Sequence, residues 1–105
     1  MALVNVVVDP PPANIIEGPT AFTPNNDGIN DQFMITIKGY VDFVTLRFYN
    51  RNGQFMFMTK SQSNLWDGSH EGRQLPGGTY YWLFEGVDQY WRTAVKKSGY
   101  VTIIR

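Results

Sequence analysis

The stretch Thr45–Thr59, "TLRFYNRNGQFMFMT", decides the fold. Thr45–Tyr49 alternates apolar residues with polar or amphipathic ones, which is typical of a strand that is buried on one face. Asn50–Gly53 follows, and an Asn-Gly pair between two such runs is a strong hairpin signal because both residues tolerate positive φ. Gln54–Lys60 is expected to be the second strand, with Phe55 and Phe57 on one face. The stretch therefore predicts an antiparallel β-hairpin.

The same period of two extends over most of the chain. Turn signals occur at Leu75–Gly78 and Asp88–Gln89, and Gly99 is expected to introduce the last strand. Besides the hairpin, the expected strands are Leu3–Val8, Phe33–Lys38, Thr79–Val87, Tyr90–Lys96 and Tyr100–Ile104. No alternation of strands with helices is visible, so a parallel sheet is not expected. The pattern predicts an all-β fold, an antiparallel immunoglobulin-like β-sandwich of about seven to eight strands, with a small barrel as the alternative.

Size and charge exclude several classes of protein. The chain has 105 residues, no cysteine, and nine basic residues against nine acidic ones. A length near 100 residues fits one domain. A zero net charge argues against a protein that binds nucleic acid through its phosphates. The lack of cysteine excludes disulfides, thiol catalysis and cysteine zinc sites.

The N-terminal region differs from the rest of the chain. Residues 1–19, which include the proline run Pro10–Pro12, are expected to be a linker and an N-terminal strand from a preceding region, and residues 20–105 the domain. Leu3–Val8 is too short for a transmembrane helix and lacks the basic flank of a signal peptide. The chain is therefore expected to be either cytoplasmic or a piece of a longer exported precursor.

Catalysis is difficult to build from these residues. The single histidine, His70, lies in the loop Asp67–Gly72 beside Ser69. Members of a catalytic triad normally come from separate elements, so a short loop rich in glycine and aspartate is better explained as a solvated turn. The close acidic pairs also lie in turns, with no evident cleft for a glycosidase. We expect no enzymatic activity.

The loop Pro24–Asp31, "PNNDGIND", is the best candidate for a metal site. Calcium prefers oxygen ligands on a tight loop with a glycine at the bend, and Asn25, Asp27 and Asp31 carry such oxygens. The spacing of an EF-hand and its terminal glutamate are absent. The alternative is that Asn and Asp side chains bond to local backbone amides without any ion. No cofactor other than calcium is expected.

The aromatic residues suggest a second kind of ligand. The chain contains three tryptophans, six tyrosines and seven phenylalanines. Sugar-binding modules often carry exposed aromatic platforms on a sandwich, so a calcium- or carbohydrate-binding adhesion module is an alternative function. Most of these rings are nevertheless expected in the core, since large rings commonly fill small sandwiches. Exposed rings such as Tyr90 or Tyr100 would mark a partner surface as readily as a sugar site.

Five ordered motifs resemble those of a known family. They are "FTPNNDGIND" at Phe22–Asp31, "FYNRNGQ" at Phe48–Gln54, "NLWDG" at Asn64–Gly68, "LPGGTYYW" at Leu75–Trp82 and "GYVTIIR" at Gly99–Arg105. Their order, spacing and final position are similar to those of the gliding motility-associated C-terminal domain. That domain is the type B C-terminal sorting domain of the Bacteroidetes type IX secretion system.

This resemblance implies a non-enzymatic sorting signal on a large secreted or cell-surface protein, often an adhesin. Such a domain directs its cargo through the outer-membrane translocon and works with a dedicated outer-membrane β-barrel partner. The chain would then be exported as the C-terminal part of a larger precursor, to the cell surface or outer membrane or into the medium. Most motif residues are expected to serve the fold, with glycines in turns and Trp66 filling one end of the sandwich.

A receptor could read such a domain by strand addition, in which main-chain hydrogen bonds give affinity. The expected edge comprises Tyr100, Val101, Thr102, Ile103 and Ile104, with Arg105 facing an acidic group of the receptor. Loops at one end of the sandwich would add a second contact surface. The residues expected there are Asn25, Asn26, Leu75 and Pro76.

Overall fold

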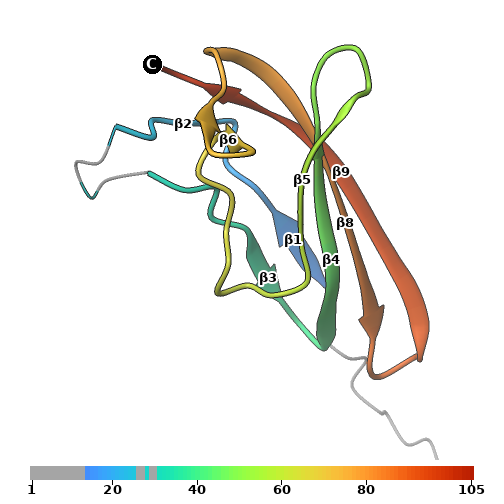
Figure 1. Ribbon diagram of the computed structural model, residues 1–105. Helices are drawn as coiled ribbons and strands as arrows, with labels where there is room; N and C mark the ends of the chain where they lie inside the picture. The colour runs from blue at the N-terminus through green and yellow to red at the C-terminus, as the bar shows by residue number, and fades with distance from the viewer. Residues whose placement is uncertain (1–13, 26–27, 29–30) are drawn as a thin grey trace, which may run out of the picture.

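The computed structural model describes residues 14–25, 28 and 31–105 (Figure 1). The strands in this part of the chain are β1 (Ile15–Glu17), β2 (Ala21–Phe22), β3 (Thr36–Lys38), β4 (Val41–Tyr49), β5 (Phe55–Thr59), β6 (Ser69–His70), β7 (Arg73–Gln74), β8 (Gly78–Asp88) and β9 (Thr93–Ile103). They form one five-stranded sheet in the order β2-β9-β8-β4-β5 and two small sheets, β1-β3 and β6-β7. The prediction of an all-β, immunoglobulin-like fold is confirmed. The strand expected at Leu3–Val8 lies outside the described residues.

No helix in the described part of the chain is long and apolar enough to cross a bilayer.

The predicted hairpin at Asn50–Gly53 is confirmed, and it joins β4 to β5. The side-chain oxygen of Asn50 accepts the backbone N–H of Asn52 and of Gln54, both at 2.9 Å. Gly53 adopts φ = 79°, the left-handed conformation that makes glycine favourable there. The prediction that Phe55 and Phe57 share a face is wrong. A bulge shifts the register of β4 against β5, so Phe57 lies near the core while Phe55 is half exposed.

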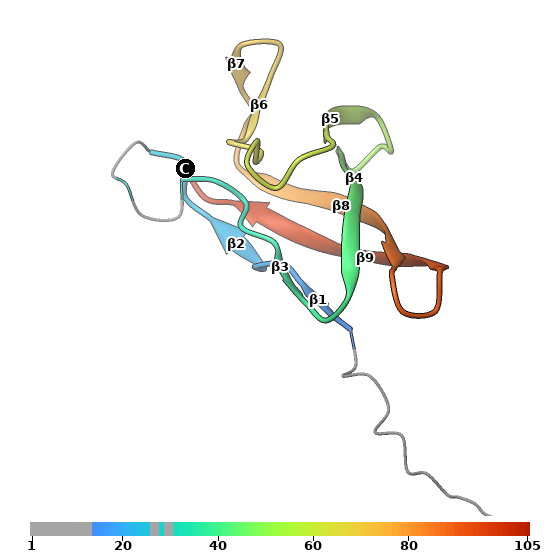
Figure 2. The same ribbon diagram turned by 90° about the horizontal axis from the view of Figure 1, so that it is seen from below.

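One face of the large sheet, here called the inner face, carries the core. The β1-β3 ribbon packs over this face and forms the thin second layer of the sandwich (Figure 2). Alternation in β4 and β8 selects the inward residues, which is why Phe48 and Phe84 are fully buried. Phe33 and Ile35 are also buried although β3 begins only at Thr36, so the expected strand at 33–38 is shorter than predicted while its burial pattern holds.

The last strand is longer than expected. β9 runs without interruption from Thr93 to Ile103 and pairs with β8 over its whole length. The prediction that Gly99 separates two strands is therefore wrong. Gly99 lies opposite Trp82, and a Cβ at Gly99 would come within 2.7 Å of the indole ring. The glycine is required by the close approach of this ring and does not mark a turn.

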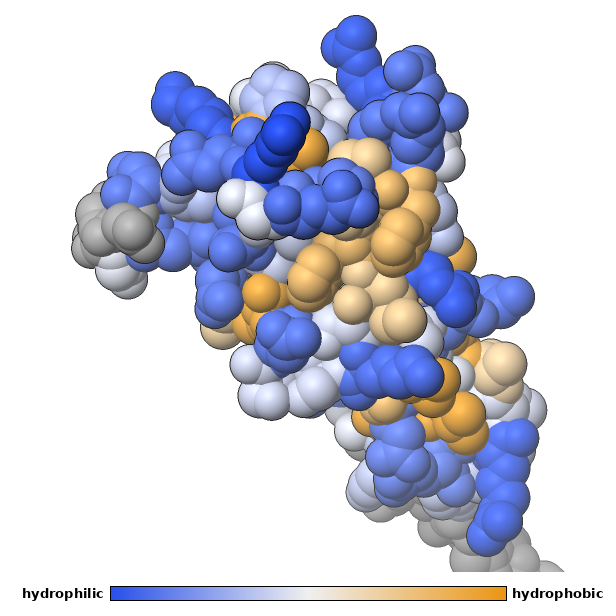
Figure 3. Space-filling view, in the orientation of Figure 1, coloured by the Kyte–Doolittle hydropathy of each residue, from blue (hydrophilic) through white to orange (hydrophobic). Residues whose placement is uncertain are grey.

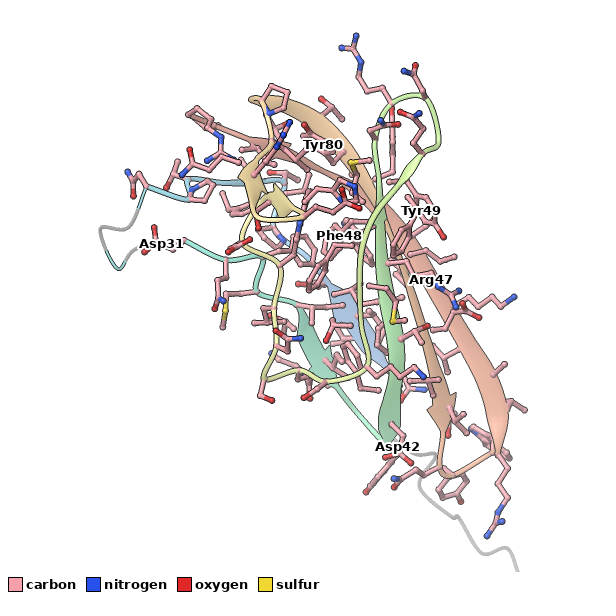
Figure 4. The ribbon with its side chains drawn as sticks, in the orientation of Figure 1. Asp31, Asp42, Arg47, Phe48, Tyr49 and Tyr80 are labelled. Atoms are coloured by element: carbon pink, nitrogen blue, oxygen red, sulfur yellow. The ribbon has the colours of Figure 1, made fainter. Side chains whose placement is uncertain are left out.

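The opposite face of the large sheet, here called the outer face, is not covered by any described strand. Figure 4 shows Phe48 on one side of β4, and Arg47 and Tyr49 on the other. Cross-strand register places Tyr49 beside Tyr81, and Tyr81 beside Tyr100. Phe55 pairs with Tyr49 at the end of this row, with ring centroids 6.2 Å apart. The outer face thus carries an aromatic row of Phe55, Tyr49, Tyr81 and Tyr100, and apolar surface is also visible over β5 (Figure 3).

At the end of the sheet where β8 meets β9, a buried carboxylate closes the turn. Asp88 accepts the N–H groups of Tyr90 and Trp91 at 2.8 and 3.0 Å. The side chain of Asn14 donates to the other oxygen of Asp88 at 2.5 Å. The bond from the Trp91 amide is the main reason that the pKa of Asp88 lies below its usual value. The contact with Asn14 ties the entry into β1 to the end of β8.

Candidate functional site

Arg105 joins loops that are far apart in the sequence. Its guanidinium donates to the carbonyl oxygen of Leu75 at 2.7 Å, of Gly68 at 3.0 Å and of Pro24 at 3.3 Å. These carbonyls belong to three of the sequence motifs, and Arg105 itself ends a fourth. An Arg guanidinium offers five N–H donors in a rigid plane, so one side chain can hold several acceptors at fixed separation. Pro24, Gly68, Leu75 and Arg105 form the group that we call the loop-end cluster.

The backbone around the cluster is positioned by β9 and by the turn before β8. Leu75 donates its N–H to the carbonyl of Gly68 at 2.9 Å, which joins two of the loops directly. Gly68 has φ = 80°, and Gly77 lies so close to β9 that a Cβ would come within 3.1 Å of the Ile103 carbonyl oxygen. Gly68 is thus favoured by its backbone angle, and Gly77 lies where a side chain would fit only tightly.

Two buried aromatic residues, Trp66 and Tyr80, lie between the cluster and the core. Trp66 is fully buried, and its Nε1 donates to the carbonyl of Ser69 at 2.8 Å. The expectation that Trp66 fills this end of the sandwich is confirmed. Tyr80, labelled in Figure 4, packs edge-on against Trp66 and donates its hydroxyl to the carbonyl of Pro76 at 2.9 Å. Burial raises the pKa of the Tyr80 hydroxyl, and the nearby charge of Arg105 partly offsets the rise.

A hollow of about 790 Å³ opens beside the cluster. The described residues that line it are Pro24, Asn25, Gly28, Asp31, Gln32, Met34, Asp67, Ser69 and Gln74. Asp31, on its rim, accepts the N–H of Gly28 at 2.7 Å and of Asn25 at 3.1 Å. The structure therefore brings the loop at 25–31 and the loop at 75–78 to the same end of the molecule.

The calcium hypothesis concerns this loop. The backbone N–H of Asn25 donates to the side-chain carboxylate of Asp31, whereas Asp27, the third expected ligand, lies outside the described residues. Among the residues that the structure describes, no group of three or more acidic or histidine side chains is arranged to hold a metal ion. The bonds from Asn25 and Gly28 to Asp31 are the local contacts that the alternative explanation expects. Calcium binding stays a prediction.

Ser69 and His70 form β6, which pairs with β7 in a short hairpin. Ser69 donates its hydroxyl to the carboxylate of Asp67 at 2.5 Å. The His70 Nδ1 lies 2.7 Å from the carbonyl oxygen of Met56 and bonds to it, while Nε2 faces Glu71 at 3.9 Å. The histidine thus fastens this hairpin to β5, and its ring is bonded to backbone and not to the serine hydroxyl.

The residues of the expected recognition strand, Tyr100–Ile104, differ in their exposure to solvent. Val101 and Ile103 are buried on the inner face, while Tyr100 and Ile104 are half exposed. The end of this strand is also no longer an open edge. The N–H groups of Thr102 and Ile104 donate to the carbonyls of Thr20 and Phe22, because β2 lies parallel to β9 there.

Of the remaining expected residues, Asn25, Leu75, Pro76 and Arg105 lie in or beside the loop-end cluster, and Asn26 lies outside the described residues. Arg105 was expected to face an acidic receptor group, yet each of its guanidinium nitrogens contacts a backbone carbonyl. Leu75 contributes one of those carbonyls, and Pro76 accepts the hydroxyl of Tyr80. Whether a receptor contacts any of these residues stays a prediction.

Sequence reasoning missed two features of this surface. One is the role of the Pro24 and Gly68 carbonyls as acceptors for Arg105, which no side-chain pattern reveals. The other is the aromatic row on the outer face, which depends on the register between four strands. One signal could have revealed this aromatic row. Each of the four predicted strands has an aromatic residue at or near the end that an antiparallel arrangement would bring together.

Comparison with known proteins gave one match. A family model described as CHU_C type IX secretion signal domain matches residues 16–103 of the chain. The matched region begins within β1 and ends with β9, so it covers all the described strands except the first residue of β1. Neither a curated protein nor a solved structure matches the chain.

Proposed function

Because the chain belongs to the type IX secretion signal domain family, we propose that it directs a cargo protein through the outer-membrane translocon of that system. The observation that carries the proposal is the match over residues 16–103, which covers nearly all of the strands that the structure describes. The signal is the folded domain acting as a binding surface, without a catalytic step. The chain works as the C-terminal part of a larger exported precursor.

The finer assignment follows the sequence motifs. We propose a type B sorting domain, of the kind associated with gliding motility in Bacteroidetes, attached to an adhesin-like protein. Its receptor is an outer-membrane β-barrel dedicated to this class of signal. The cargo then stays at the cell surface or is released. A separate N-terminal signal would carry the precursor across the inner membrane.

The loop-end cluster supports recognition of a folded surface. Its carbonyls come from positions 24, 68 and 75, and they adjoin only because the chain has folded around Arg105. A receptor that contacts this end would therefore distinguish a folded domain from an unfolded one. The neighbouring hollow of about 790 Å³ offers concave surface at the same end.

A transplantation experiment tests the proposal. Residues 1–105 are fused behind a fluorescent protein that carries its own inner-membrane export signal, in a Bacteroidetes host with an active type IX system. We expect the reporter to become accessible to external protease, and the same reporter without the domain to stay in the periplasm. Retention of both reporters, while a natural cargo of the host reaches the surface, would refute the proposal.

A matched pair of variants then tests the loop-end cluster. Arg105→Ala removes all three guanidinium bonds, whereas Arg51→Ala removes an arginine from the exposed turn at the tip of the hairpin. We expect export to fall for Arg105→Ala and to stay unchanged for Arg51→Ala. Equal export of the two variants would show that the cluster is not needed for recognition.

A second function is favoured by the aromatic row, and we propose glycan binding as the alternative role of the domain. Tyr81 and Tyr100 are 48% and 53% exposed on neighbouring strands, where their rings could stack on sugar rings. Isothermal titration with cellohexaose measures this directly. Binding should be lost in a Tyr81→Ala/Tyr100→Ala variant and kept in Tyr40→Ala/Tyr90→Ala, which removes an equally exposed tyrosine pair at another position. No heat of binding to the unmodified domain would exclude this ligand.

A further inference from the structure

The edge of the large sheet at β9 is only partly occupied. β2 pairs with β9 through two residues, at Ala21–Thr102 and Phe22–Ile103. Upstream of that point, the strand preceding β2 turns away into the β1-β3 ribbon. Among the described strands, none pairs with β9 between Thr93 and Tyr100 along the edge that faces away from β8. Most of this eleven-residue strand therefore has one open side, and we call its segment Ala94–Tyr100 the open half of β9.

The direction of the backbone groups on this open side follows from the β2 contacts. Thr102 and Ile104 donate their N–H groups toward β2, away from β8. Because successive residues of a strand point their N–H groups to opposite sides, those of Ala94, Lys96 and Ser98 point the same way as that of Thr102. The N–H of Tyr100 continues the series. The open half of β9 thus offers four donors and their carbonyls in regular spacing to an additional strand.

The open half of β9 is also positively charged. Arg92, Lys96 and Lys97 lie on it or at its start, all are exposed, and the strand contains no acidic residue. In the part of the chain that the structure describes, neither lysine has an ion-pair partner. Glu85, which lies opposite Lys96 on β8, is paired with Arg47 at 2.8 Å instead. The domain as a whole has zero net charge, so this basic edge is local.

The positive charges of Lys96 and Lys97 indicate what kind of strand can pair with this edge. Two copies of the domain joined antiparallel through β9, about a twofold axis near its open centre, would bring Lys96 and Lys97 of one copy close to those of the other. Like charges opposite one another destabilise a strand pair, and edge lysines discourage self-association for this reason. An incoming strand with acidic side chains would meet the opposite situation, since each carboxylate would find an unpaired lysine.

We propose that the open half of β9, from Ala94 to Tyr100, binds an extended segment of another protein by strand addition. The segment carries acidic side chains opposite Lys96 and Lys97. It carries an apolar side chain beside the exposed ring of Tyr100, on the outer face. Main-chain bonds supply the affinity and the two lysines supply the register. The inference rests on β9 alone and holds whether or not the partner belongs to the secretion machinery.

Amide hydrogen exchange, read by NMR on the whole 105-residue chain, tests the proposal without using secretion. The probe is a ten-residue synthetic peptide that alternates valine and threonine and has aspartate at two central positions. A control peptide has lysine at those two positions. In the free domain we expect rapid exchange at Ala94, Lys96, Ser98 and Tyr100, and slow exchange at the residues between them, which bond to β8. The acidic peptide should slow the first group by about tenfold or more, and the lysine peptide should not.

Two sets of variants make the outcome specific. Ser98→Pro removes one outward N–H and leaves the bonds of Lys97 and Gly99 to β8 in place, so protection by the peptide should disappear. Lys96→Glu/Lys97→Glu should reverse the preference between the two peptides, whereas Lys38→Glu/Lys60→Glu, with the same change in net charge at other sites, should leave it unaltered. Protection at β5 in place of β9, or no protection at millimolar peptide, would overturn the proposal.

Discussion

Removal of Arg105 should destabilise the domain more than removal of any other exposed arginine. Its two shorter bonds, at 2.7 and 3.0 Å, are charge-assisted and partly exposed, so each contributes about 1 kcal/mol. The third bond, at 3.3 Å, contributes less. Arg105→Ala is therefore expected to lower the free energy of unfolding by about 2–3 kcal/mol, which corresponds to about 10 °C in Tm for a domain of this size.

Urea denaturation followed by tryptophan fluorescence measures this change, because Trp66 lies buried under the cluster. Arg105→Lys keeps the positive charge but lacks the planar fork, so it should recover less than half of the loss. Arg51→Ala, in the hairpin turn, should change the free energy of unfolding by no more than about 0.5 kcal/mol. An Arg105→Ala domain as stable as Arg51→Ala would refute the view that Arg105 fastens the loops together.

Three further predictions concern other parts of the molecule. Gly99→Ala places a Cβ within 2.7 Å of the Trp82 ring and should cost about 1–3 kcal/mol in urea denaturation; a neutral effect would show that the indole can move aside. The amide of Trp91 holds the pKa of Asp88 below its usual value, so the stabilisation is complete above the unfolded pKa of about 3.9 and is lost as the pH falls through the lower folded pKa. The difference in free energy of unfolding between the native domain and Asp88→Asn should therefore become smaller as the pH is lowered. A difference that does not change with pH would contradict this. For the loop at 25–31, the calcium hypothesis predicts a higher Tm in millimolar calcium than in chelator, and equal values would remove it.

Local sequence signals predicted the elements of the fold well. The Asn-Gly pair and the alternation on both sides of it identified β4 and β5. Alternation also predicted that Phe33 and Ile35 are buried, although the structure begins β3 only at Thr36. These features depend only on neighbouring residues, so a single sequence contains them. The glycine-rich loop before β8 was predicted for the same reason.

Features that depend on contacts between distant segments were not predicted. Gly99 looked like a turn because its need for space comes from Trp82, seventeen positions away. Phe55 was placed on the wrong face because a bulge shifts the register of its strand. The parallel pairing of β2 with β9 and the contact of Arg105 with the Pro24 carbonyl join residues near opposite ends of the chain. Such contacts are set by tertiary packing, which leaves no periodic trace in the sequence.

The most direct test of the sorting role is the dependence of export on the type IX machinery. The fluorescent reporter fused to residues 1–105 is expressed in two strains of a Bacteroidetes host that differ only in a deletion of the outer-membrane translocon. The surface-accessible fraction of the reporter is then measured by protease digestion of intact cells. The reporter should reach the surface in the parent strain and remain in the periplasm of the deletion strain. An equal surface fraction in both strains would contradict the proposed role.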